Sequence, residues 1–189
     1  MINFNHIKFV IYQLTRPFSY LSIKHEDKWY YDWLTPLVLT ILTLAVSVFY
    51  IPIQSITGSE GLVSDITSFI SNLPGFFIAA LAAVATFNKH DIDQPMANPP
   101  KIEIFYHGSY LMIDMTRRRF LCVLFSYLTA VSIFLILGAK IALKIEISEQ
   151  FKIPLSWVGF GIFNFLLWQM VLATILGLYY LGERLHTPQ

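Results

Sequence analysis

Four long segments of the chain contain no Asp, Glu, Lys, Arg or His. They cover residues 33–59, 66–88, 120–139 and 153–182, and they are 27, 23, 20 and 30 residues long. An α-helix rises about 1.5 Å per residue, so about 20 apolar residues cross the roughly 30 Å hydrocarbon core of a bilayer. Soluble helices seldom lack charges on every face. The pattern predicts an all-α integral membrane protein with four transmembrane helices, at about residues 34–56, 66–88, 120–139 and 155–180.

The spans divide the chain into a polar N-terminal segment, residues 1–32, and a transmembrane domain, residues 33–189. Within that domain, the only sizeable polar piece between two spans is the loop 89–119. Lys and Arg in short loops tend to stay cytoplasmic. Segment 1–32 holds four of them, loop 89–119 five and the tail 183–189 one, against three elsewhere. We therefore predict a multi-pass protein whose termini and loop 89–119 face the cytoplasm.

Composition agrees with a membrane protein and excludes some soluble functions. The 189 residues are 56% hydrophobic and 13% charged, against about 25% charged in soluble domains. The net charge of +1 gives no basic field for nucleic acid, so direct nucleic-acid binding is not expected. A single cysteine, Cys122, cannot form an intrachain disulfide.

The first fifteen residues predict a short amphipathic helix. Apolar residues recur there at helical spacing: Phe4, Ile7, Val10, Ile11 and Leu14. Pro17 is expected to end that helix. Such a helix either lies on the inner leaflet of the membrane or packs against the cytoplasmic side of the protein.

The second span carries a ridge of small residues, Gly75, Ala79 and Ala83, at intervals of four. Small residues let helix backbones approach closely, and packing drives helix association in lipid. The ridge therefore predicts contact with another span of the same chain or with a neighbouring subunit, and we expect a small homo-oligomer, with a tetramer favoured. Pro74 is expected to kink this span or to delay its start.

Loop 89–119 combines a proline-rich stretch, a possible hairpin and three arginines. Its "QPMANPP" part is expected to be extended, and "KIEIFYHGSYLMIDM" predicts two short strands around His107–Gly108–Ser109. A metal site at the neighbouring polar residues is a weak alternative, because three nearby ligands lack a distant partner: His90, Asp91 and Asp93. No nucleophile–base pair or phosphate-binding glycine loop is present in the sequence, so we expect no enzyme activity, no metal and no cofactor.

With four spans, a proline-rich basic inner loop and the closing "GLYYLGERLH", the chain resembles KwaA, the small membrane subunit of the bacterial Kiwa anti-phage defence system. The resemblance implies a non-enzymatic inner-membrane sensor or scaffold in a two-component phage-resistance complex. It also implies recruitment of a cytosolic, nucleic-acid-binding partner, KwaB. The runner-up is a small homo-oligomeric ion channel or holin-like pore, lined by uncharged polar residues of the last two spans.

The arginine triplet at the start of the third span suggests where such a partner would dock. Arg119 lies closest to the apolar run and is expected to anchor the topology. One or two positive charges would suffice for that purpose, and adjacent guanidiniums can bind acidic residues of a docked protein. We therefore expect partner docking to use Arg117, Arg118 and the preceding Pro99, Pro100 and Lys101.

Overall fold

The structure is a computed structural model that describes residues 4–58, 60–88, 90–94, 99–106, 109–145 and 148–182. Three helical elements precede the first long helix: α1 (Phe4–Thr15), the 3-10 helix η1 (Arg16–Ser22) and the π-helical turn η2 (Tyr30–Leu34). Then follow α2 (Thr35–Tyr50), α3 (Ile53–Thr57), α4 (Leu62–Ile70), α5 (Leu73–Thr86), the 3-10 turn η3 (His90–Asp93), the strands β1 (Lys101–Tyr106) and β2 (Ser109–Asp114), and the helices α6 (Arg117–Ala142) and α7 (Glu149–Gly182).

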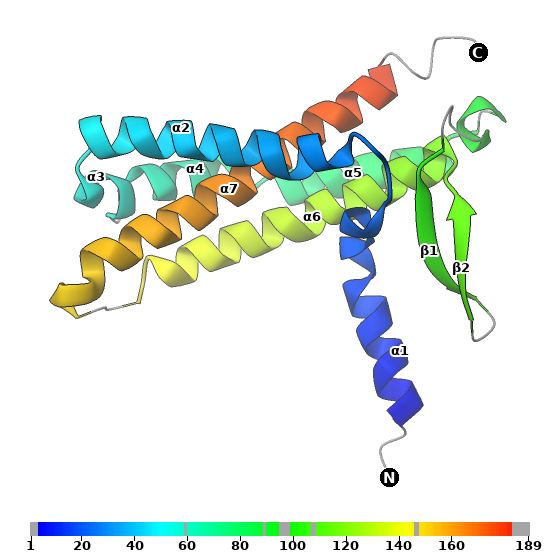
Figure 1. Cartoon of the computed structure of the whole chain (residues 1–189), viewed down its shortest axis with the longest axis horizontal. Coiled ribbons are helices and arrows are strands. Elements are labelled where there is room, and N and C mark those ends of the chain that lie inside the picture. Colours follow the sequence, from blue (N-terminus) through cyan, green and yellow to red (C-terminus); the bar gives the residue numbers. More distant parts are fainter. Residues whose placement is uncertain are drawn as a thin grey trace.

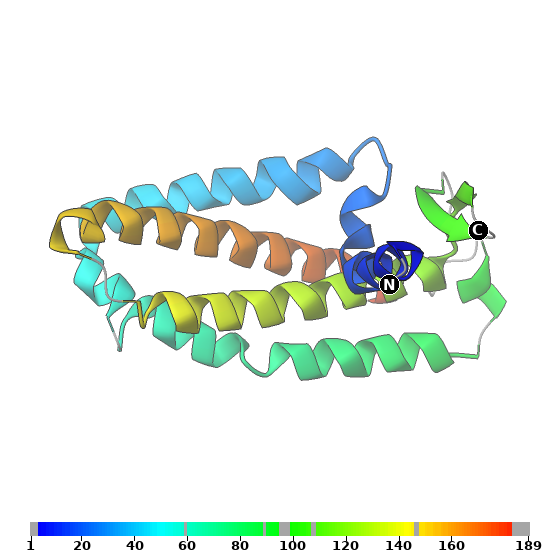
Figure 2. The ribbon, with the colours of Figure 1, turned by 90° about the horizontal axis from the view of Figure 1, so that it is seen from below.

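The long helices lie side by side in a row rather than in a square bundle. Figure 2 shows α2 along one edge, then α7, then α6, with α4 and α5 along the other edge, and the packed pairs α2–α7, α6–α7 and α5–α6 agree. Successive members of the chain run in alternating directions (Figure 1). The helices therefore form a single layer, with α6 and α7 inside and with α2 and the pair α4–α5 at its edges. Much apolar surface remains exposed on the two faces of this layer.

Four helical stretches within the described residues are long and apolar enough to cross a membrane. They are Tyr30–Tyr50, Ile53–Thr86, Arg117–Ala142 and Gln150–Gly182. The predicted number of membrane-length helical stretches is confirmed. The window in Arg117–Ala142 is 50% buried within the molecule, whereas those in the first two stretches are each 17% buried. Helix α6 is therefore the centre around which the other elements pack.

Prolines explain why the first two stretches differ in detail from the predicted spans. Span 34–56 is not one helix, because α2 ends at Tyr50, Ile51 is extended and Pro52 precedes the separate helix α3. Span 66–88 is broken at residues 71–72, between α4 and α5, and Pro74 lies in the first turn of α5. A proline cannot donate a backbone hydrogen bond and clashes with the preceding turn.

The other two helices extend beyond the predicted spans. Helix α6 begins at Arg117, so the three arginines form its first turn, and the side chain of Thr116 caps it by accepting a hydrogen bond from the Arg119 backbone N–H at 3.3 Å. Helix α7 begins before Pro154, which lies inside it. A bend near that start is visible in Figure 1.

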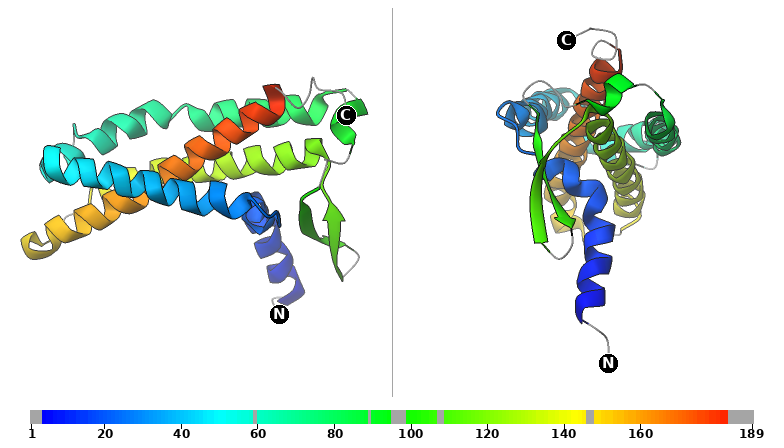
Figure 3. Two further views of the ribbon diagram at one scale, coloured as in Figure 1. Left: turned by 45° about the horizontal axis from the view of Figure 1, so that its top comes forward. Right: turned by 90° about the vertical axis from the view of Figure 1, so that its right-hand side faces the viewer.

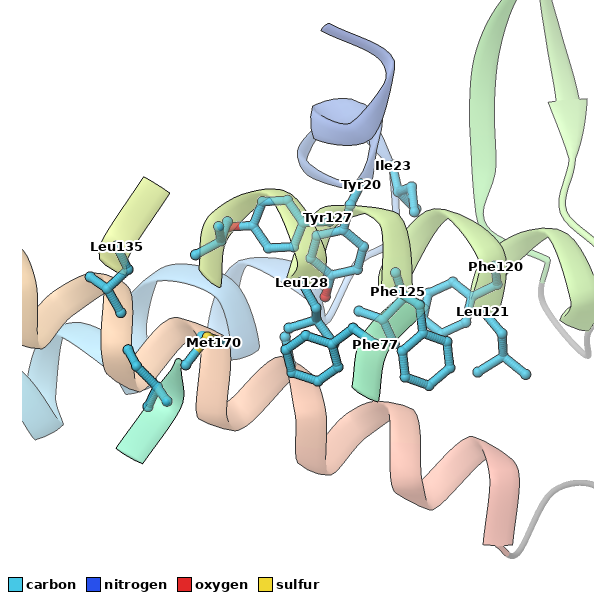
Figure 4. Close-up of a cluster of buried hydrophobic side chains, with 14 of the residues drawn as sticks. Tyr20, Ile23, Phe77, Phe120, Leu121, Phe125, Tyr127, Leu128, Leu135 and Met170 are labelled. Atoms are coloured by element: carbon cyan, nitrogen blue, oxygen red, sulfur yellow. The ribbon is translucent and has the colours of Figure 1, made fainter. Parts of the chain in front are cut away.

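The core follows α6 along most of its length. Figure 4 shows Phe120, Phe125 and Leu128 from α6 meeting Phe77 from α5 and Met170 from α7. Leu128 is fully buried and Met170 is 1% exposed. The core thus joins α5, α6 and α7 into one packed unit.

A two-stranded antiparallel hairpin follows α5, as the sequence predicts. Its register pairs Lys101 with Asp114 at the base and Tyr106 with Ser109 near the tip. Positions 107–108, which the prediction places in the turn, lie outside the described residues. The strands carry the chain from the end of α5 back to the start of α6.

Helix α1 and the hairpin project sideways from the row, both toward the same end of it (Figures 1 and 3). The C-terminal end of α7 lies at that end as well (Figure 1). We call it the hairpin end. The predicted polar segment 1–32 and loop 89–119 therefore lie at the same end of the molecule, with the α6–α7 connection at the opposite end.

Candidate functional site

A cavity of about 1220 Å³ opens at the hairpin end. Its walls come from the linker between η1 and α2, the base of the hairpin, the first turns of α6 and the last turns of α7. Pro99, Pro100, Lys101 and Arg117 all line it. Four of the five residues predicted for partner docking are thus brought to one site, although they are up to 18 positions apart in the sequence.

The fifth, Arg118, makes internal contacts instead. Its Nε donates to Asp93 Oδ1 at 2.7 Å and one terminal nitrogen donates to Asp93 Oδ2 at 2.9 Å. The same nitrogen donates to the Phe87 carbonyl at 2.7 Å, and the other donates to the carbonyls of Val84 and Ala85 at 3.1 and 3.0 Å. A guanidinium has five N–H donors. Arg118 therefore has a partner for every donor without any second molecule.

These contacts give the arginine triplet a structural role. Cations are unfavourable at the N-terminus of a helix and favourable at its C-terminus. Arg118 lies in the first turn of α6 but reaches the C-terminal carbonyls of the neighbouring α5. It therefore fixes the end of α5 to the start of α6 and holds η3 through Asp93.

The three arginines also differ in exposure. Arg117 is 6% exposed, whereas Arg119 is exposed. The sequence-based hypothesis assigns partner docking to Arg117 and Arg118 and topology anchoring to Arg119. Docking stays a prediction. Of the three side chains, however, that of Arg119 is the one that a second molecule could reach most easily.

A buried polar network lies beneath the cavity. The carboxylate of Asp32, a residue 2% exposed, accepts a hydrogen bond from the Tyr20 hydroxyl at 2.9 Å and forms an ion pair with Lys28. Gln169 Nε2 donates to the Asp32 carbonyl at 2.9 Å, and the Tyr127 hydroxyl donates to Gln169 Oε1 at 2.7 Å. The network therefore ties the N-terminal segment to both inner helices, α6 and α7.

The aromatic rings of this network reinforce the tie. Tyr20 stacks on Tyr127 with ring centroids 4.8 Å apart, and the Lys28 ammonium lies 4.2 Å from the Tyr20 centroid. Figure 4 shows Tyr20 and Tyr127 meeting between the N-terminal ribbon and α6. Burial, and then the neighbouring Asp32 carboxylate, raise the pKa of the Tyr20 phenol above its ordinary value. Tyr20 thus stays a neutral hydrogen-bond donor at physiological pH.

Sequence reasoning missed this network because Asp32 lies one residue before the first uncharged segment. That position suggests a solvated boundary charge, as for other charged residues that flank a span. Tyr127, however, is seven residues past Phe120, or about 10 Å along α6. Because Gln169 bonds both Tyr127 and the backbone of Asp32, the network that contains the Asp32 carboxylate extends to the level of the predicted third span. The i,i+4 spacing of Lys28 and Asp32 was the available signal.

The small-residue ridge lies on the outside of the molecule. Gly75, Ala79 and Ala83 are all exposed, and a Cβ added at Gly75 would meet nothing within 4 Å. Helix α5 instead packs against α6 through its other face, with Phe77 and Val84 each 4% exposed. The ridge is therefore available to lipid or to a neighbouring subunit, and self-association through it stays a prediction.

The weak metal alternative gains no support in the described residues. No group of three His, Cys, Asp or Glu side chains gathers there as a metal site would require. Asp93 is engaged by Arg118, and the side chains of His90 and Asp91 lie outside what the structure describes.

Comparisons of the chain with protein-family models, with curated proteins and with solved structures find no match. The resemblance to the Kiwa membrane subunit therefore stays a hypothesis, and functional conclusions depend on the geometry described above.

Proposed function

We propose that the chain is a multi-pass protein of the bacterial inner membrane with its hairpin end in the cytoplasm. The outward surfaces of the long helices support insertion: Phe49, Phe69 and Phe76 are 82%, 80% and 67% exposed. Soluble monomers rarely expose large apolar patches. Trp29 and Trp33, which are 58% and 49% exposed near the hairpin end, suit the headgroup region of a bilayer.

The orientation of α1 fits the same placement. The helix projects to the side of the long helices rather than along them (Figure 1), so it would lie along the membrane surface when they cross the bilayer. Ile7, Val10 and Leu14 are 42%, 46% and 71% exposed. An unburied apolar face on a helix in this plane favours adsorption to the inner leaflet over packing against the protein.

The function that this arrangement supports best is a sensor or scaffold subunit that recruits a cytosolic partner. The observation that carries the proposal is the gathering of α1, the hairpin and the cavity at one end. Leu111 and Met112 on β2 are 45% and 46% exposed, and Arg119 in the first turn of α6 is exposed as well. Met and Arg are enriched in protein interfaces relative to the rest of the surface. By resemblance, the partner is the nucleic-acid-binding subunit KwaB.

A homo-oligomeric pore is the second candidate, favoured by the exposed ridge at Gly75. The side chains that would line such a pore are, however, engaged inside the single chain. Ser132 donates to the Thr129 carbonyl at 2.9 Å, Asn164 donates to the Phe160 carbonyl at 3.2 Å, and Gln169 belongs to the buried network. We therefore favour the scaffold.

Co-purification with KwaB from membranes, together with phage plating, tests the proposal. The variant Arg119→Glu with Met112→Asp is expected to lose partner recovery and phage protection while remaining in the membrane fraction. The matched control Lys144→Glu with Ile145→Asp changes exposed residues at the opposite end and should behave like the wild type. Normal partner recovery with the first variant would refute this docking face. Ion leakage without any partner would favour the pore.

A further inference from the structure

The cavity at the hairpin end has one apolar wall, formed by a single stripe of α7. Leu172, Ile175, Leu176 and Tyr179 line it at the i, i+3, i+4, i+7 spacing of one helix face. Ile175 is 57% exposed and Tyr179 is 43% exposed, so within the described residues the stripe is not covered. It extends from Leu172 to Tyr179, a rise of about 10 Å, which is enough to contact the first part of an acyl chain.

The rest of the lining is largely polar and includes two lysines. Lys24 and Lys101 face each other in an antiparallel bridge, with backbone hydrogen bonds of 3.0 and 3.3 Å in the two directions. Directly opposed residues of such a pair place their side chains on the same face, where like charges repel. Asp114 is opposite Lys101 on its other side, yet neither lysine comes within ion-pair distance of a carboxylate in the described part of the chain.

The remaining charges of the lining are mixed rather than uniformly basic. Glu26 and Asp27 lie on the same short loop as Lys24, and His25 accepts the Asp27 backbone N–H at 3.3 Å. Lys28 is committed to Asp32, and Arg117 is 6% exposed and has its own interactions within the chain. Cations and carboxylates thus share one lining with the apolar stripe of α7.

We propose that this cavity binds a membrane phospholipid with a phosphoethanolamine headgroup. The phosphate lies between the ammonium groups of Lys24 and Lys101, and the primary ammonium of the headgroup donates to the carboxylates of Glu26 and Asp27. One acyl chain lies along the α7 stripe. The volume of about 1220 Å³ exceeds the roughly 300–1,000 Å³ of ordinary small-molecule pockets.

The depth of the cavity agrees with a headgroup site. Tyr31 and Tyr179 line it, and tyrosines concentrate at the membrane–water interface. The inference rests on the proposed membrane insertion. It does not require partner recruitment, and the two can fail separately: a chain absent from the membrane fraction would remove the proposed function, whereas unselective lipid binding would remove only this site.

The test uses the full chain in nanodiscs and measures the lipid retained after detergent extraction by mass spectrometry. Wild type should retain phosphatidylethanolamine in preference to phosphatidylcholine, whose trimethylammonium cannot donate hydrogen bonds, and to phosphatidylglycerol, which lacks a cation. Lys24→Gln with Lys101→Gln should weaken retention about 30-fold, which corresponds to about 2 kcal/mol at about 1 kcal/mol per lysine.

The control variant Lys140→Gln with Lys144→Gln removes the same charge from exposed positions at the opposite end and should retain the lipid normally. Glu26→Gln with Asp27→Asn should reduce the preference for ethanolamine over choline. This variant and the Lys24→Gln with Lys101→Gln variant should both keep the wild-type thermal midpoint. Equal retention of the three lipids, a preference for phosphatidylglycerol, or displacement by inorganic phosphate alone would overturn the assignment.

Discussion

Removing the Asp32 charge should destabilise the protein more than its position beside the first span suggests. Asp32→Asn keeps an oxygen to accept the Tyr20 hydrogen bond but leaves the Lys28 ammonium without its carboxylate. The two side chains are 3% and 12% exposed. Breaking one partner of a buried ion pair costs about 3–5 kcal/mol. Lys28 has a flexible side chain and lies beside the open cavity. We therefore expect Asp32→Asn to lower the free energy of unfolding by about 3 kcal/mol, the lower end of this range.

A double-mutant cycle separates the ion pair from other effects. Lys28→Met with Asp32→Asn removes both charges, and replacing a buried pair by uncharged side chains is often close to neutral. The double variant should therefore recover most of the stability that Asp32→Asn loses, giving a coupling of about 2 kcal/mol or more.

Reversible unfolding in mixed detergent micelles, followed by circular dichroism and tryptophan fluorescence, measures these free energies. The matched control is Asp65→Asn, an exposed carboxylate in the first turn of α4, which should change stability by less than about 0.5 kcal/mol. If Asp32→Asn costs no more than this control, or if the double variant is less stable than the single one, then Asp32 is not the buried centre of the network.

Three further predictions follow from the packing. Arg118→Gln should lower the thermal midpoint and expose residues 87–94 to protease, because Arg118 bonds the end of α5, whereas Arg119→Gln should leave both unchanged, because that side chain is exposed. Ala79→Leu should shift a homo-oligomer to smaller species in native mass spectrometry without lowering the monomer's stability, because this side chain is exposed; an unchanged size distribution would remove the ridge from the interface. Above about pH 10, wild-type stability should fall more steeply than that of Tyr20→Phe, by up to about 1.4 kcal/mol per pH unit, because the raised pKa keeps the folded phenol protonated after the unfolded one ionises; parallel pH curves would contradict this.

Sequence reasoning succeeded where one dominant signal controls the local structure. Uncharged segments long enough for a bilayer predicted the membrane-length helices, and two short, largely apolar runs on either side of His107–Gly108–Ser109 predicted β1 and β2. The breaks at Pro52 and at residues 71–72 show how prolines divide a continuous apolar segment into several helices. Pro74 predicted a kink or a late start of the second span, whereas the break at Pro52, near the end of the first uncharged segment, was not predicted.

The site was harder to predict because it depends on contacts between distant residues. Nothing local shows that Arg118 reaches carbonyls 31 to 34 positions earlier, or that Gln169 bonds the backbone of Asp32, 137 positions away. The basic triplet indicated an important surface but could not show which guanidinium is buried, which is internally bonded and which is exposed. These distinctions come from how α5, η3 and α6 pack, which hydropathy does not encode.

Cysteine accessibility in intact bacterial cells tests the central claim, that the chain spans the inner membrane with its hairpin end inside. In a Cys122→Ser background, one variant carries Ser109→Cys on the hairpin and another carries Lys144→Cys at the opposite end. Both native residues are exposed in the structure. An impermeant maleimide should label Lys144→Cys from outside and should label Ser109→Cys only after the inner membrane is permeabilised. Labelling of Ser109→Cys in intact cells, with Lys144→Cys protected, would reverse the topology and contradict the account.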